Sequence, residues 1–182
     1  MRRFIERVQA YSQWIAVSAA VLLMAGGIAY SVHLGEELKY QDEKDYYELA
    51  VILVTTGNYA LSDGELTAFR APGYPLLLAG LYGVGGGIVS ARLVNFSLLA
   101  ATVLLCCGIA RRISGGVAAA FTALLLLGYP VLFYTAGTLY PQTLSGFLLA
   151  LFLWLAWRQS AAAWVYFVAG VVYGGLVLTV PV

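Results

Sequence analysis

Apolar stretches of near-membrane length recur along the chain, separated by short polar segments. The first covers about residues 15–32 and follows a basic, amphipathic opening segment, MRRFIERVQAYSQW. The later ones cover residues 72–84, 89–110, 116–134, 143–157 and 161–182. A helix that crosses a bilayer needs about 20 mainly apolar residues. The pattern therefore predicts a helical membrane protein with several spans.

The apolar segment at residues 72–84 decides the topology. It is short for a span, begins with Pro-Gly-Tyr-Pro and ends in a glycine-rich turn, so its helix has only a few turns. If it crossed the bilayer, Arg111, Arg112 and Arg158 would face away from the arginines near the amino terminus. If it lies along the surface, all of these arginines share one side. The positive-inside rule favours the surface position.

We therefore expect an all-α membrane protein with about five transmembrane helices. The expected parts are a cytoplasmic amino terminus at 1–13, a first span at 14–34, an external loop with amphipathic juxtamembrane helices at 35–89, and a bundle with spans at 90–110, 115–135, 142–158 and 162–182. The arginines of the opening segment place the amino terminus in the cytoplasm and the chain in the cell inner (plasma) membrane as a multi-pass protein. Because the chain stops inside an apolar run, it is expected to be either the first part of a longer protein or a short paralogue.

Composition and charge narrow the classes of function. The chain of 182 residues is 62% hydrophobic and 10% charged, whereas a soluble domain is roughly half apolar and a quarter charged. Its net charge is +1, and no basic stripe with interleaved aromatic residues suggests nucleic-acid binding. Cys106 and Cys107 are adjacent in an apolar run, which indicates packing residues and neither a disulfide nor a metal site.

The polar loop between residues 34 and 70 holds nearly all the acidic residues. It contains eight acids and three bases, and Glu6 is the one acid outside it. A helix is predicted to begin with Asp42 as N-cap and Asp45 at N3, and to stop at Gly57. One face of this helix is apolar at helical spacing, with Tyr46, Leu49, Ala50 and Leu53. We expect this amphipathic helix to lie at the outer membrane surface.

Several loop motifs occur in a fixed order. They are Asp42-Glu43-Lys44-Asp45-Tyr46-Tyr47-Glu48-Leu49-Ala50, then Gly57-Asn58-Tyr59, then the segment 67–75 (TAFRAPGYP), followed by Arg92-Leu93, Ala110-Arg111-Arg112 and Gly128-Tyr129-Pro130. From about residue 15 onward the chain resembles the GT-C glycosyltransferases, above all the protein mannosyltransferase-like and lipid A aminoarabinose transferase-like groups. Members of that family usually continue well beyond the length of this chain.

The resemblance implies an external active site that takes a polyprenyl-phosphate sugar from the surrounding membrane lipid. Asp42 would be the general base that accepts the proton of an acceptor hydroxyl. One carboxylate suffices because the leaving group is already a phosphate, whereas glycosidases need two. Arg70 would bind the donor phosphate. Glu43 would support the acceptor or a divalent metal ion.

Two departures from the family keep other functions open. Gln142 stands in the second outer loop where relatives usually carry an acid, and Val180 stands where they often carry arginine. A non-catalytic subunit of a membrane complex is therefore the alternative function. A transporter or channel ranks last because the expected spans have essentially no ionisable residues away from their ends. A plain helix cap is an equally good interpretation of Asp42, and an interfacial anchor is the alternative for Arg70.

Overall fold

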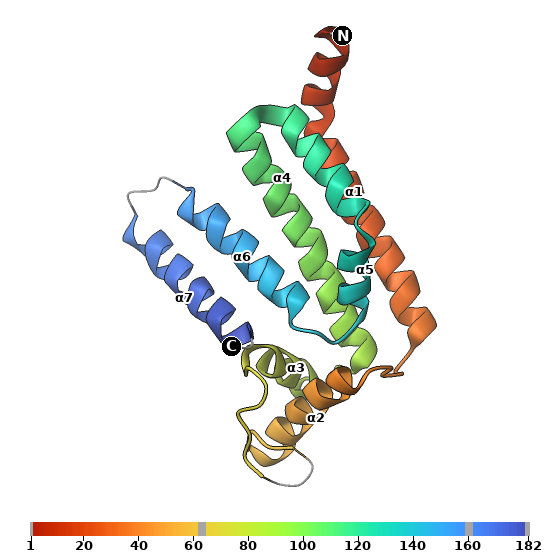
Figure 1. The fold of residues 1–182 in the computed structure, drawn as a ribbon, viewed down its shortest axis with the longest axis vertical. Coiled ribbons are helices and arrows are strands. Elements are labelled where there is room, and N and C mark those ends of the chain that lie inside the picture. Colours follow the sequence, from red (N-terminus) through yellow and green to blue (C-terminus); the bar gives the residue numbers. More distant parts are fainter. Residues whose placement is uncertain (1, 62–64, 159–161, 181–182) are drawn as a thin grey trace.

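The computed structural model describes residues 2–61, 65–158 and 162–180, with side chains from residue 6 onward. Within those ranges the regular structure is α-helical, apart from one isolated antiparallel bridge between Ala60 and Leu66. The helices are α1 (Arg2–Leu34), α2 (Gln41–Thr56), α3 (Gly73–Gly83), α4 (Ile88–Leu127), α5 (Pro130–Gly137), α6 (Gln142–Ala156) and α7 (Ala163–Thr179). The long helices form a bundle, and α2 and α3 lie at one end of it (Figure 1).

The centre of the bundle is the packing of α1 against α4. Helix α4 doubles back at Gly115, whose φ of 82° and ψ of −173° suit only glycine, so its second limb returns beside the first (Figure 1). Small residues let α1 and α4 approach closely. A Cβ added to Gly27 of α1 would lie 2.2 Å from the Phe96 ring of α4. The fully buried Phe96 and Val103 of α4 anchor this core.

The sequence predicted one span over residues 115–135, but two helices occupy that range. The second limb of α4 ends at Leu127, and α5 begins at Pro130 with that proline in its first turn. Proline cannot donate the backbone hydrogen bond that would continue α4, so the break falls in front of it. Helix α1 is continuous from Arg2 to Leu34, so one helix includes both the opening segment and the residues expected to form the first span.

Helix α2 has a different type of cap at each end. It stops at Gly57, as predicted, where a left-handed φ of 75° lets the glycine N–H bond the Leu53 carbonyl. The predicted start is wrong: the N-cap is Tyr40, and Glu43 occupies N3. The Glu43 carboxylate reaches back to accept the Tyr40 N–H at 3.1 Å, which is the capping-box contact expected of an N3 glutamate.

Helices α2 and α3 share a second hydrophobic core at the loop end of the bundle. The predicted apolar face of α2 is confirmed, since Tyr46, Leu49 and Ala50 are buried. The Tyr46 ring meets the Tyr74 ring of α3 edge to face, with centroids 5.5 Å apart. Helix α3 has 11 residues, which is too short to cross a bilayer. It packs against α2 and also contacts α7.

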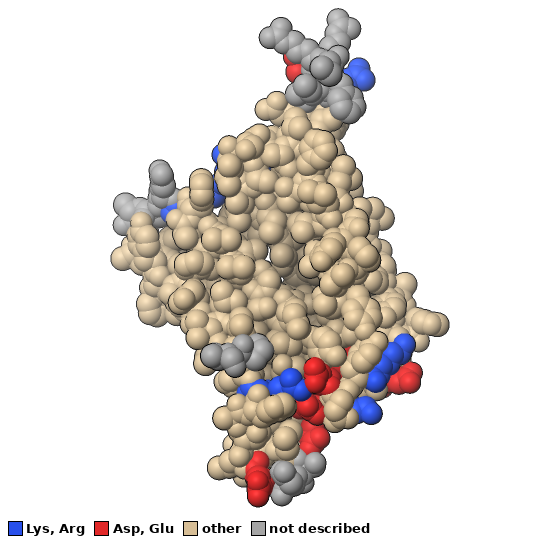
Figure 2. All heavy atoms as spheres, in the orientation of Figure 1, with Lys and Arg blue, Asp and Glu red and all other residues tan. Residues whose placement is uncertain are grey.

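The charges of the described residues gather at the two ends of the molecule, with an uncharged band between them (Figure 2). Two helices, Glu6–Leu34 and Ile88–Leu127, are long and apolar enough to cross a membrane, and the α5–α6 pair, bent by 117°, makes a third if it counts as one broken span. Helix α7 is apolar but shorter. The apolar helices indicate a membrane protein with two to three candidate spans by this measure.

The close contact at Gly27 gives a test of the α1–α4 packing. We expect Gly27→Ala to destabilise the protein by about 1–3 kcal/mol, because the new methyl overlaps the Phe96 ring inside a packed core. Thermal unfolding in detergent, followed by tryptophan fluorescence, measures the effect. Gly170→Ala is the matched control, since a Cβ there meets nothing within 4 Å. Equal melting temperatures for both variants would contradict the packing described.

Candidate functional site

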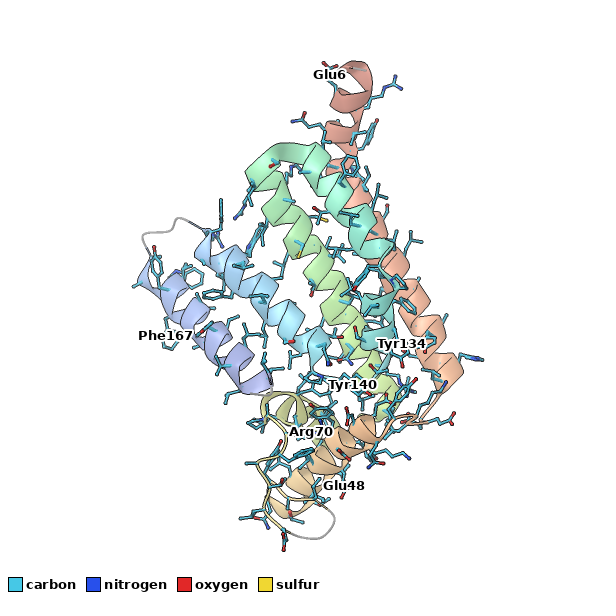
Figure 3. The ribbon with its side chains drawn as sticks, viewed as in Figure 1. Glu6, Glu48, Arg70, Tyr134, Tyr140 and Phe167 are labelled. Atoms are coloured by element: carbon cyan, nitrogen blue, oxygen red, sulfur yellow. The ribbon has the colours of Figure 1, made fainter. Side chains whose placement is uncertain are left out.

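An arginine and two carboxylates form an ion-paired cluster at the loop end of the bundle. Arg70 Nη2 lies 2.5 Å from Asp42 Oδ1 and 2.9 Å from Asp45 Oδ2. The two aspartates stand one turn apart on α2, and Arg70 comes from the segment that leads into α3 (Figure 3). The Asp42 side chain is 52% exposed, whereas those of Asp45 and Arg70 are 18% and 17% exposed. Asp42 is thus the member of the cluster that an external molecule can reach.

Aromatic residues hold the Arg70 side chain and backbone in place. The guanidinium carbon lies 5.1 Å from the Tyr46 ring centroid and 4.7 Å from that of Phe69. The Tyr59 hydroxyl donates a hydrogen bond of 2.9 Å to the Arg70 carbonyl. Burial raises the pKa of Tyr59 to about 12 and also raises the pKa of Tyr46. Both tyrosines therefore stay neutral in the physiological range and act as donors or ring partners.

Burial alone would lower the pKa of Arg70, but its hydrogen bonds to Asp45 and Asp42 outweigh that effect and raise it. The guanidinium donates to both carboxylates through a single nitrogen, Nη2. Its Nε is buried and has no hydrogen-bond partner among the described residues. Because this nitrogen is buried, an external anion reaches it only if the surrounding side chains move.

Tyrosines border the cluster on the side of the α5–α6 linker. The Tyr40 ring lies 6.4 Å from Tyr140 and 6.2 Å from Tyr134, measured between centroids (Figure 3). Burial raises the pKa of Tyr140, and the nearby Asp42 carboxylate adds to the shift. This edge of the site therefore offers neutral aromatic surfaces and hydroxyl groups.

Glu43, the neighbour of Asp42, points into the protein and is 1% exposed. Its Oε2 accepts backbone N–H groups from Lys39 (2.9 Å) and Tyr40 (3.1 Å), and its Oε1 accepts that of Leu139 (3.0 Å). These three bonds use most of the acceptor positions of one carboxylate. Among the described residues no group of three or more His, Cys, Asp or Glu could hold a metal ion. The residues present therefore do not fit a divalent metal held by Glu43, and its role is structural support.

Two polar residues of α4 support the same region, and their role was missed in the sequence. Arg92 is 1% exposed and donates to the backbone carbonyls of Gly137 (3.0 Å), Gly35 and Glu37. Asn95, also 1% exposed, donates to the Thr138 carbonyl and the Tyr74 hydroxyl, both at 2.9 Å. An arginine and an asparagine three residues apart in an apolar helix are the signal that could have pointed to a buried polar network.

A polar cavity of about 140 Å³ lies beside these supports. Its lining includes Tyr30, Lys39, Tyr40, Glu43, Arg92 and Tyr134. It reaches from the end of α1 to the α5–α6 linker, so it adjoins the tyrosine edge of the Asp42–Arg70 cluster.

The structure brings together some of the expected site residues and separates others. Asp42 and Arg70, 28 positions apart, are in direct contact. Glu43 faces the interior, as described above. Gln142 is the first residue of α6, is exposed, and is not among the partners of Asp42 or Arg70 in the described contacts.

Comparisons with known proteins add no assignment to this geometry. Neither a protein-family model, nor a curated protein, nor a solved structure matches the chain. The Asp42–Arg70 cluster and its supports therefore carry the functional argument.

The role of Glu43 can be tested through stability. Glu43→Gln replaces one acceptor oxygen with an amide donor that faces backbone N–H groups, so we expect a loss of about 1–3 kcal/mol for each donor left unpaired. Thermal unfolding in detergent is the measurement, and Glu37→Gln, which neutralises an exposed acid of the same loop, is the control. A Glu43→Gln protein as stable as wild type would exclude the supporting role.

Proposed function

We propose that this chain is a glycosyltransferase of the GT-C type, or the amino-terminal part of one, which transfers a sugar from a polyprenyl phosphate to an acceptor hydroxyl. The observation that supports this most is the direct contact of Asp42 with Arg70. It pairs an accessible carboxylate with a charged guanidinium at the end of an apolar bundle, where a lipid phosphate and a water-soluble acceptor can meet. The order of the loop motifs adds the family resemblance to that geometry.

The proposal includes a topology of five spans in the cell inner (plasma) membrane. These are α1, the first limb of α4, its second limb continued by α5, then α6 and α7. Residues 35–89, with α2 and α3, would lie outside and the amino terminus in the cytoplasm. Arg111 and Arg112 precede the turn of α4, and Arg158 follows α6. Both places lie at the end of the bundle away from α2 and α3, and this separation from the acidic cluster supports the arrangement (Figure 1).

In the proposed reaction the acceptor hydroxyl gives its proton to the Asp42 carboxylate. The acceptor oxygen then forms a bond to the anomeric carbon of the sugar, and the bond between that carbon and the phosphate oxygen breaks. The electron pair stays on the phosphate, which leaves as polyprenyl phosphate. Asp42 suits the base because its side chain is half exposed at the surface of the cluster.

Arg70 would stabilise the charge that gathers on the departing phosphate. Its Nη2 is bound by both aspartates, which orient the guanidinium. Electrostatic stabilisation by such preorganised donors is usually the largest catalytic contribution in transfer reactions of this kind. Asp45 would position Arg70 without contacting the substrate.

The assay compares wild type, Asp42→Asn and Glu37→Gln in sugar transfer from a panel of labelled polyprenyl-phosphate hexoses and pentoses. We expect Asp42→Asn to lower transfer about 100-fold or more, because an amide cannot accept the proton. Glu37→Gln removes the same charge from the same loop and should retain wild-type transfer. The melting temperatures of the three proteins show whether they are equally folded.

Equal transfer by wild type and Asp42→Asn would remove Asp42 from the mechanism. An equal loss of transfer in Asp42→Asn and Glu37→Gln would mean that transfer depends on the total charge of the loop and not on a carboxylate at position 42. Either result contradicts the proposed base.

A non-catalytic subunit of a membrane complex is the second candidate, and one observation favours it. Both carboxylates of the cluster are bound to Arg70, and the exposed Gln142 offers no further acid. Such an ion-paired cluster can serve as a structural tie between α2 and the segment before α3. This function predicts stable co-purification with larger membrane proteins and no turnover of any donor in the panel, whereas turnover by the isolated protein excludes it.

A further inference from the structure

A second site lies at the other end of the bundle, in a groove of about 200 Å³ formed by α1 and both limbs of α4. Its floor consists of small or compact buried side chains, namely Ser12, Ala16, Cys107 and Ala119. Its rims are exposed and include Gln13 and Val17 on α1, and Leu104 and Arg111 on α4. The groove is thus open to whatever surrounds the bundle at this level.

Polarity changes along this groove in the same direction on both walls. On α1 the lining passes from Ser12 and Gln13 to Val17, about 6 Å further from the charged end. On α4 it passes from Arg111 to Leu104, about 10 Å deeper. A polar mouth therefore leads into an apolar trough that runs towards the middle of the uncharged band.

The charge at this end of the bundle is net positive. The charged side chains described here are Glu6 and Arg7 near the start of α1, Arg111 and Arg112 before the turn of α4, and Arg158 after α6. Arg112 is engaged with the Trp154 ring, 3.7 Å from its centroid. Arg111 makes no hydrogen bond or ion pair with the part of the chain that the structure describes. Its forked donors are free for an anion, and a guanidinium binds phosphate oxygens well.

We propose that this groove binds one anionic glycerophospholipid. The headgroup phosphate would lie at Arg111 and Gln13, and the adjoining acyl chain would lie along Val17 and Leu104. A lipid fits better than a soluble phosphate because the trough below Arg111 is apolar and open at the level of the uncharged band. Basic pockets between spanning helices are a recognised form of anionic-lipid site. The site is independent of the Asp42–Arg70 cluster, which lies at the opposite end.

The test uses the full chain in detergent, with dioleoyl phosphatidylglycerol and dioleoyl phosphatidylcholine as the probes. Native mass spectrometry measures the bound fraction of each lipid at equal concentration. We expect wild type to bind the anionic lipid about fivefold more tightly, because both lipids carry a phosphate but only phosphatidylglycerol has a net negative charge for Arg111 to attract. Arg111→Gln should abolish the preference, and Arg111→Lys should retain most of it because the charge remains.

The matched control is Arg158→Gln, which removes an exposed arginine at the same end but outside the groove, and it should keep the wild-type preference. Loss of preference in this control would show an effect of general charge and would overturn the site. An unchanged preference in Arg111→Gln would overturn it as well. A third ligand, sn-glycerol 3-phosphate, has the charge without the chains and should leave the melting temperature unchanged. If it stabilises the protein as the lipid does, the groove is a phosphate site and the lipid proposal fails.

Discussion

Buried polar side chains hold three consecutive residues where α5 ends and the α5–α6 linker begins, and the position of the loop region depends on those contacts. The pairs are Arg92 with the Gly137 carbonyl, Asn95 with the Thr138 carbonyl, and Glu43 with the Leu139 N–H. Burying a guanidinium or a carboxylate costs several kcal/mol unless hydrogen bonds satisfy it. Here the backbone supplies those bonds, so the linker, α2 and α4 are stable only in this mutual arrangement. A change in any one of them leaves a buried polar group without its partner.

This constraint also orients the candidate site. Successive residues of a helix point about 100° apart, so fixing Glu43 towards the interior turns Asp42 to the outside. Asp45, three positions further, falls on nearly the same side as Asp42 and can share Arg70 with it. The accessible carboxylate is thus positioned by the inaccessible one beside it. A reactive group of this kind gains its precision from a buried neighbour that takes no part in the chemistry.

Much of the helical layout could be predicted from the sequence, because apolar runs of membrane length have few alternatives in lipid. The stop of α2 at Gly57 and its buried face were also predictable from local chemistry. The start of α2 was not, because two acids, Asp42 and Glu43, are adjacent and the tertiary contact with Leu139 decides which of them turns inward. Arg92 posed the same difficulty. Its partners are backbone carbonyls 45 to 57 positions away. Every residue has a backbone carbonyl, so the sequence does not indicate which ones Arg92 will bind.

Three arginines show how the surroundings decide what one residue type does. Arg92 is buried and donates to carbonyls, which makes it a structural tie. Arg70 is mostly buried and donates to two carboxylates, one of which is exposed. Arg111 is exposed and has no partner among the described residues, but it borders an apolar groove. A guanidinium is charged in all three settings, so its function follows from the donors that the fold leaves unused. By that criterion Arg111, at the edge of its groove, is a position where this bundle can still bind an anion.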